Sequence, residues 1–187
     1  MGGKGPFVKA IDQQLQRGDI DAAIHCLKDV PGDQPMSQGL IFAGMLPRAG
    51  LERLGLTHRI VAEFTVHEML PAVGAGVLAL ECRRDDAPVA ALLERLNHPK
   101  TQTEATAERV MLHGLRGHCN SPIAGYCTTE PDGQLSLRGM VFSRDGSKFA
   151  HAHIWDETSN DPATLGSRVC AELLRQDARD IIEGIPH

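Results

Sequence analysis

The sequence predicts a chain that combines an α/β part with a small α+β part. In the first half, segments with helical periodicity alternate with short apolar segments typical of buried strands, which is the pattern of α/β folds. In the second half, three segments of alternating polarity follow one another, separated by the turn sequences EPDG and RDG. These turns favour hairpins, so we expect a three-stranded antiparallel sheet accompanied by helices.

In the first half, each element follows from its own pattern. The first helix has apolar side chains at helical spacing and ends at Gly18. The last strand is an almost continuous apolar run, which is expected of a strand buried on both faces. Together the patterns predict helices over 6–17 and, in one or two pieces, over 49–64, and strands over 19–26, 39–46 and 73–82.

The second half begins with two helical patterns that a break at 97–99 separates. The three strands follow, and a closing helix has its leucines and valine on one side, with a last short helical turn before Gly184. The predicted helices cover 86–96, 99–115 and 161–177, and the predicted strands cover 123–129, 134–142 and 148–155.

Composition narrows the class of protein. The 187 residues carry a net charge of -5, so no overall basic field would attract nucleic acid or an acidic membrane, and we expect neither as a partner. The five cysteines show no paired CxxC spacing, which favours free thiols and a cytoplasmic location. The longest apolar run, 70–82, is well short of the roughly 20 residues of a membrane span, and the first residues lack the apolar core of a signal peptide.

The sequence KDVP, residues 28–31, follows the predicted strand 19–26 and offers a first candidate site. Open α/β sheets bind ligands beyond the carboxyl ends of their strands, so Asp29 there is placed to stabilise a cation or to move a proton. The alternative is structural: Asp29 caps the turn and Lys28 is solvated.

The sequence RGHCNSPIAG, residues 116–125, offers a second candidate. Its glycines and proline shape a loop between helix and strand with Cys119 at the centre, flanked by Arg116 and His118. A thiol on an accessible, electropositive loop is a candidate nucleophile, and the alternative is a passive cysteine.

Two further patterns point only weakly to a ligand site. The side chains of His113, His118, Cys119, His151 and His153 are potential zinc ligands, but their spacing matches no common structural zinc pattern. The sequence GGKG at 2–5 lacks the rest of a phosphate-binding loop, so a flexible loop that carries Lys4 is the better interpretation.

Five segments, in this order, resemble the porphobilinogen deaminase family, also called hydroxymethylbilane synthase. The likeness runs through nearly the whole chain. The segments are GGKGPFVK (2–9), DAAIHCLKDVP (21–31), AGLERLGL (49–56), LPAVGAGVLALECR (70–83) and TAERVMLHGLRGHCNSPIAGY (106–126).

The resemblance implies a transferase of tetrapyrrole and haem biosynthesis that joins four porphobilinogen molecules into hydroxymethylbilane and releases ammonia. It implies a dipyrromethane cofactor attached through a thioether to Cys119 and a catalytic aspartate at Asp29, which Lys28 and His25 orient. By the same resemblance Arg53 helps to hold substrate carboxylates, and Lys4 lies in a mobile loop near the active site.

The resemblance also implies a domain plan with two departures from the family. A partial, periplasmic-binding-protein-like α/β domain would comprise 1–48 and 71–97, with a remnant of the second domain at 49–70 and a cofactor-attachment domain at 98–187. The start of the first domain is missing, and the arginine-rich segment that the family has between Arg48 and Ala49 is absent. Cys26 and Ala75 replace a serine and a glutamine that are common in the family.

Two hypotheses about function follow. The first is an active porphobilinogen deaminase, and the alternative is an inactive remnant of the family that lacks most of the substrate-binding arginines. We expect a monomer, with association through exposed sheet edges as a second possibility.

Overall fold

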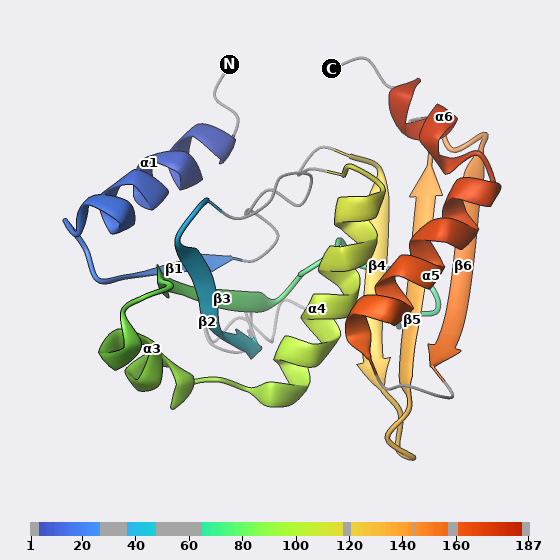
Figure 1. Ribbon diagram of the computed structural model, residues 1–187. Coiled ribbons are helices and arrows are strands. Elements are labelled where there is room, and N and C mark those ends of the chain that lie inside the picture. Colours follow the sequence, from blue (N-terminus) through green and yellow to red (C-terminus); the bar gives the residue numbers. More distant parts are fainter. Residues whose placement is uncertain are drawn as a thin grey trace, which may run out of the picture.

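Two three-stranded sheets, each antiparallel, form the framework of the computed structural model (Figure 1). The structure describes residues 4–26, 37–47, 65–117, 121–143, 145–156 and 161–184. The first sheet contains β1 (Ala22–Cys26), β3 (Val77–Arg83) and β2 (Leu40–Pro47), in that order across the sheet, and the second contains β4 (Ile123–Thr129), β5 (Leu135–Phe142) and β6 (Phe149–Asp156). The expected combination of helices and strands, and the three-stranded antiparallel sheet in the second half, are therefore confirmed.

In the first sheet β3 is the central strand, and four of its residues in a row are buried. It pairs with β1 from Ala22 opposite Cys82 to Cys26 opposite Leu78, and with β2 on its other side. Helix α1 (Lys4–Arg17) packs on this sheet through Leu15, which contacts the cluster of Ala23 and Leu40. This pairing is antiparallel, whereas the sheets of α/β folds are usually parallel. The strand patterns do not predict the direction of pairing, because it is set by contacts between residues far apart in the chain.

Arg83, the last residue of β3, connects three neighbouring segments through hydrogen bonds. Its Nη1 donates to the carbonyl oxygen of Ile20 at 2.8 Å, and its Nη2 donates to Asp21 at 2.9 Å and also to Asp86. Asp86 in turn accepts the N–H of Val89 and caps helix α3 (Ala87–Glu94). One guanidinium thus ties together the start of β1, the end of β3 and the start of α3.

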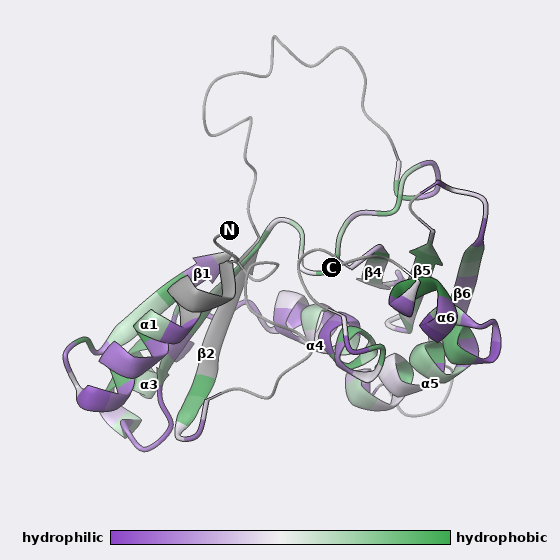
Figure 2. Cartoon of the chain, turned by 90° about the horizontal axis from the view of Figure 1, so that it is seen from above, coloured by the Kyte–Doolittle hydropathy of each residue, from purple (hydrophilic) through white to green (hydrophobic). Residues whose placement is uncertain are grey.

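The second sheet has helices on one face. Helix α5 (Pro162–Arg175) packs on β5 and β6 and against α4 (Pro99–Gly114), while α6 (Ala178–Glu183) contacts β5. Figure 2 shows that apolar residues concentrate in these strands and along α5. The core is made of Met111, Leu137, Val141, Leu165, Val169 and Leu173, each fully buried. Because α4 also contacts β2, it lies between the two sheets (Figure 1).

Both hairpins of the second sheet turn where the sequence predicts. Gly133 and Gly146 have φ of 87° and 71°, a conformation that glycine adopts at little cost. In the second turn Asp145 accepts bonds from the hydroxyls of Ser143 and Ser147 and from the N–H of Ser147, which lowers the pKa of its carboxyl to about 2. The turn is therefore closed by a carboxylate that stays ionised.

Residues 71–76, which we call the linking segment, connect the two sheets. Ala72 forms an isolated antiparallel bridge with Ala124 of β4, and the N–H of Gly125 donates to the carbonyl oxygen of Pro71 at 2.9 Å. The chain then turns and enters β3 at Val77. The prediction of one strand over 73–82 is wrong at its start, because Gly74 and Gly76 have φ of 69° and 79°, which an extended strand does not allow.

Most other bounds agree with the sequence patterns to within three residues. The prediction that Lys4 lies in a loop is wrong for its backbone, since α1 begins at Lys4 rather than at residue 6. The predicted helices at 49–64 lie outside the described residues. Among the described helices, none is both long and apolar enough to span a membrane.

Candidate functional site

The strand that precedes KDVP is fixed in the first sheet by a buried pair of side chains. His25 Nε2 lies 2.7 Å from Glu81 Oε2, and both side chains are at most 4% exposed. In the ladder His25 is opposite Ala79 and Ala23 is opposite Glu81, so the pair is a diagonal neighbour on one face of the sheet. A buried carboxylate needs such a donor, and the contact holds β1 in register up to its last residue, Cys26.

Four of the residues that the sequence predicts for the site lie outside the described residues: Lys28, Asp29, Arg53 and Cys119. The fifth, Lys4, is the first residue of α1, and its side chain is also outside the described part. The structure does describe the residues that flank the two loops of interest. These flanks are Cys26, before Asp29, and Gly117 and Ser121, on either side of Cys119.

Both flanks are attached to the same short piece of chain. Cys26, three residues before Asp29, pairs with Leu78, and Ala124, five residues after Cys119, bridges to Ala72. Ala72 and Leu78 are six residues apart, and a chain of that length spans at most about 20 Å. The linking segment and the first residues of β3 therefore bring the end of β1 and the start of β4 into the same region.

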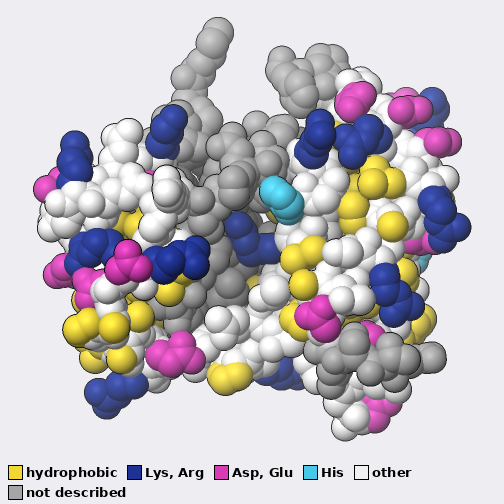
Figure 3. Space-filling model, viewed as in Figure 1, with side chains coloured by type: hydrophobic (Ala, Val, Ile, Leu, Met, Phe, Trp, Pro, Cys, Tyr) yellow, Lys and Arg dark blue, Asp and Glu magenta, His cyan; other side chains and the backbone are white. Residues whose placement is uncertain are grey.

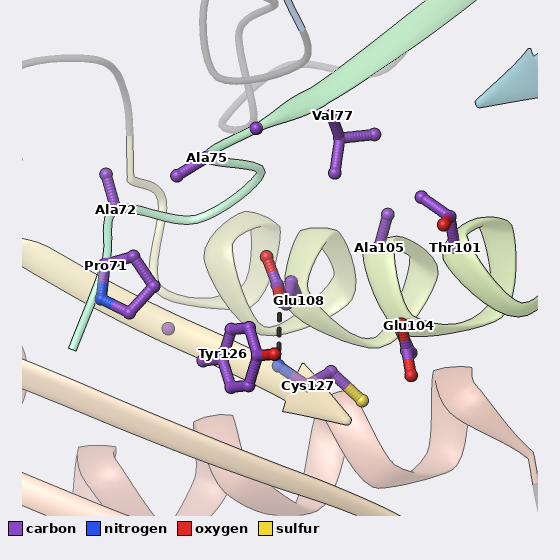
Figure 4. A pocket seen from close by; sticks show the side chains of 12 residues that line it. Pro71, Ala72, Ala75, Val77, Thr101, Glu104, Ala105, Glu108, Tyr126 and Cys127 are labelled. Carbon is purple, nitrogen blue, oxygen red and sulfur yellow. Dashed lines mark hydrogen bonds between the residues drawn. The ribbon is translucent and has the colours of Figure 1, made fainter. Parts of the chain in front are cut away.

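A cavity of about 430 Å³ lies in this region, between the linking segment, α4 and β4 (Figure 4). Helix α4 contributes residues at the spacing of a single helical face, and β4 contributes three consecutive residues. The lining consists of Pro71, Ala72, Ala75, Gly76, Val77, Thr101, Glu104, Ala105, Glu108, Gly125, Tyr126 and Cys127. The walls are mainly apolar, and the ionisable side chains in them are two carboxyls, a phenol and a thiol.

Glu108 is the buried charge of this cavity, with 7% of the residue exposed. Its Oε2 accepts the N–H of Gly74 at 2.8 Å and its Oε1 accepts the N–H of Cys127 at 2.9 Å, the bond drawn in Figure 4. Burial raises the pKa of its carboxyl to about 7, although the two N–H groups act in the opposite direction and the charge of Glu104 adds to the rise. Glu108 therefore titrates near neutral pH.

Glu104, one helical turn earlier, makes the corresponding contact with the next part of β4. Its Oε1 accepts the N–H of Thr129 at 2.7 Å and the hydroxyl of Thr129 at 2.9 Å. Four helical residues rise about 6 Å and two strand residues about 6.6 Å, so two glutamates four apart match two N–H groups two apart. Because β4 is an edge strand, these bonds satisfy donors that the sheet leaves free.

The three described free cysteines are unsuited to nucleophilic chemistry. Cys82, Cys127 and Cys170 are all buried, and burial raises the pKa of each thiol. For Cys127 the nearby charges of Glu108 and Glu104 raise the pKa further. These thiols stay protonated and inaccessible, in contrast to the exposed, electropositive surroundings of reactive cysteines.

Metal binding finds no support among the described residues, where no group of three or more His, Cys, Asp or Glu side chains could hold an ion. His151 and His153, two positions apart on β6, share a strand face and lie opposite Met140 and Arg138. His153 Nε2 lies 3.1 Å from Ser136 Oγ, and the centroid of its ring lies 3.7 Å from that of Trp155, with the two rings tilted by 39°. Figure 3 shows basic and acidic side chains interspersed on both halves of one face.

Sequence reasoning missed two residues. Glu81 stands in an apolar strand pattern and Glu108 stands on a helix face with Ala105 and Met111, and a charged residue within an apolar pattern is the signal that could have found both. Their partners could not be predicted, because His25, Gly74 and Cys127 are far away in the sequence.

The framework defines a mixed α/β class of protein with a carboxyl-lined cavity between two sheets. Comparison with family models places residues 102–175 in the porphobilinogen deaminase C-terminal domain, and residues 1–49 and 36–91 in the porphobilinogen deaminase dipyromethane cofactor binding domain. The chain belongs to the porphobilinogen deaminase family.

Individual relatives align with this chain over almost its whole length. Porphobilinogen deaminase 2 of Streptomyces coelicolor is 36% identical over 255 positions, which cover 99% of this chain and 81% of the relative. Porphobilinogen deaminase of an Exiguobacterium species is 32% identical, covering 99% of this chain and 82% of the relative. The chloroplastic enzyme of Pisum sativum is 30% identical, covering 93% and 66%.

The alignments also bear on the expected internal deletion. The alignment to the Streptomyces relative runs over 255 positions, whereas this chain has 187 residues. The cofactor-domain model matches in two stretches, 1–49 and 36–91, which overlap in this chain, rather than in one. Both observations indicate that the relatives contain residues with no counterpart in this chain.

Proposed function

We propose that this chain joins four porphobilinogen molecules into hydroxymethylbilane with release of ammonia. The observation that carries the proposal is the family membership over nearly the full length, which includes a match to the cofactor-binding domain. The structure supports it through residues 72–78, to which the flank of the Asp29 loop and the flank of the Cys119 loop attach at positions six residues apart.

Cys119 is the proposed attachment residue of the dipyrromethane cofactor. A thiolate is a soft nucleophile suited to a thioether bond, and Cys82, Cys127 and Cys170 are too buried to form one. When bound, the cofactor supplies the pyrrole carbon to which the first substrate unit is joined. The thiol of Cys119 is therefore of the chemical type that the cofactor named by the family model requires.

Asp29 is the proposed catalytic carboxylate, and Lys28 is proposed to assist it. Loss of ammonia from a substrate leaves positive charge on the pyrrole, and a carboxylate held nearby stabilises that charge. The support from the structure is indirect: the His25–Glu81 contact fixes the strand that ends three residues before Asp29. A rigid strand end limits the positions that Asp29 can reach.

Arg53 and Lys4 are the proposed partners of the carboxylate groups on substrate and cofactor. A guanidinium binds a carboxylate with two parallel hydrogen bonds, and an ammonium acts as a point charge. Because the chain has a net charge of -5, local cations are needed to hold an acidic substrate.

The organisation proposed around this site keeps the expected domain plan. Residues 1–48 and 71–97 would form the partial first domain, of periplasmic-binding-protein type, residues 49–70 a remnant of the second, and residues 98–187 the cofactor-attachment domain. We place the reaction in the cytoplasm of the cell and assign the chain as a monomer, with porphobilinogen as its small-molecule partner.

Turnover of porphobilinogen tests this proposal. The purified chain is incubated with porphobilinogen, and substrate consumption is followed together with ammonia release. We expect equal amounts of both, loss of both in Cys119→Ala, and retention of both in the matched variant Cys170→Ala. A folded wild-type chain that consumes no porphobilinogen would contradict the proposal.

A further inference from the structure

Three parts of the structure meet at one side chain. Glu108 lies on α4, and its two carboxyl oxygens accept one N–H from the linking segment and one from β4. Gly74 and Cys127 are 53 positions apart in the sequence, and each donates its N–H to Glu108, so the carboxylate connects them. Figure 4 shows Glu108 between the helix and the strand at the wall of the cavity.

We propose that Glu108 is a positioning residue of the porphobilinogen site: it clamps the linking segment to β4 and thereby sets the start of β4, with the Cys119 loop, relative to the end of β1. This inference rests on the proposed function. It assigns to Glu108 a role through other residues, without contact with substrate or cofactor.

The location of the two bonds supports this role. Gly74 lies between Ala72, which bridges to Ala124 of β4, and Leu78, which pairs with Cys26 of β1. A bond at Gly74 therefore fixes the middle of a stretch, 72–78, that touches both flanks. Without it, the linking segment would be held to β4 by the backbone contacts of Pro71 and Ala72 and by the packing of Val73 in the core.

The proposed role also accounts for a carboxylate at position 108. Burying a charge is unfavourable, and a well-packed apolar residue often gives equal or better stability. A carboxylate, however, has two oxygens that accept separate donors in charge-assisted bonds. Neither an apolar side chain nor a glutamine, which offers one oxygen and an NH₂ group, can satisfy the N–H groups of Gly74 and Cys127 together.

Glu104 provides a matched control on the same helix face. It accepts the N–H of Thr129 on the same edge strand and lines the same cavity, but it makes no contact with the linking segment. Glu104→Gln therefore weakens the attachment of α4 to β4 at Thr129, whereas Glu108→Gln breaks the connection between Gly74 and Cys127 by losing one of its two bonds.

Hydrogen exchange at single amides tests the clamp independently of activity. In Glu108→Gln we expect protection of the Gly74 or the Cys127 amide to fall roughly tenfold, as for one lost hydrogen bond. In Glu104→Gln the same two amides should keep their protection. Unchanged protection of both amides in Glu108→Gln would overturn the clamp.

Turnover then tests the positioning role. With circular dichroism unchanged and the cofactor adduct retained on Cys119, kcat of Glu108→Gln should fall about tenfold or more, because small displacements of reacting groups have large effects on rate. Glu104→Gln should stay within about twofold of wild type. Equal rates for the two variants would overturn the role and leave Glu108 as a structural residue.

The wild-type chain offers a second readout should Glu108→Gln fail to fold. Lowering the pH from 8 to 6 protonates Glu108, so protection of Gly74, corrected for intrinsic exchange, should fall relative to Gly125, whose acceptor is the carbonyl of Pro71. A constant ratio would overturn the clamp. Absence of turnover in the wild type would instead refute the proposed function, and the positioning role with it, while the exchange data still report on the contacts.

Discussion

His25 and Glu81 meet on one face of the first sheet, with His25 Nε2 and Glu81 Oε2 2.7 Å apart and both side chains at most 4% exposed. The pair fixes β1 against β3 at the end of the strand that leads to Asp29. Removing one member of a buried pair leaves the other without a partner, which is much less favourable than losing an exposed ion pair.

The first prediction is that Glu81→Ala lowers the free energy of unfolding by about 3 kcal/mol, because His25 then loses its buried acceptor. Urea denaturation measures the change. Glu183→Ala, which removes an exposed contact with Arg179 at 3.9 Å, is the control and should change stability by less than about 0.5 kcal/mol. Similar effects of the two variants would show that the buried pair is dispensable.

The second prediction concerns pH. The pKa of Glu108 is about 7 in the folded chain against an ordinary value of 4.5, so between these values the folded chain holds a proton that the unfolded chain releases. Its contribution to stability is therefore present below pH 4.5 and declines as the pH rises to 7, by up to roughly 3 kcal/mol. Glu108→Gln removes this decline.

The measurement is the difference in unfolding free energy between wild type and Glu108→Gln at pH 5 and at pH 7.5. The advantage of the wild type should be larger at pH 5. Other ionisable groups near Glu108 are Glu104 on α4 and Tyr126 and Cys127 on β4, while the linking segment contributes none. A difference that does not vary with pH would mean that Glu108 is ionised throughout this range.

The third prediction tests the packing of α4 against α5. A Cβ on Gly166 would lie 2.4 Å from the carbonyl oxygen of Ala107 and 2.8 Å from Val110 Cβ. Gly166→Ala should therefore destabilise the chain by about 1–3 kcal/mol, although alanine favours a helix more than glycine does. Thermal unfolding of this variant is compared with that of Ser167→Ala, an exposed neighbour that should have little effect; a stabilised Gly166→Ala would refute the close packing.

The fourth prediction concerns Asp29. Asp29→Asn keeps the size of the side chain and removes its charge, so kcat should fall about 10²–10⁴-fold while the mass of the cofactor adduct is unchanged. Steady-state kinetics and intact mass measure the two effects. Asp19→Asn, at an exposed position paired with Arg17, is the control, and an Asp29→Asn rate close to wild type would remove Asp29 from the catalytic role.

The sequence was most informative where local signals agree. Strand β4 has the bounds that its alternating pattern predicts, because EPDG sets the turn that follows it. Helix α4 begins at Pro99, and His98 caps it through the N–H of Thr101 at 3.2 Å. Proline at the first turn and a break before it are local features, and local features are readable from the chain.

Features that depend on distant partners were not predictable. The order β1-β3-β2 and its antiparallel direction arise from pairing between residues 30 or more positions apart. The cavity and the Glu108 contacts require Gly74, α4 and β4 to be brought together by the fold. The identity of the catalytic residues came from the family resemblance, and their roles stay predictions because Asp29 and Cys119 lie outside the described residues.

The intact mass of the purified chain tests the central claim most directly. After incubation with porphobilinogen, we expect an added mass equal to two porphobilinogen units less two molecules of ammonia, located on Cys119 by peptide mapping and absent in Cys119→Ala. An unmodified Cys119 in a folded chain, or the same added mass on another cysteine, would contradict it.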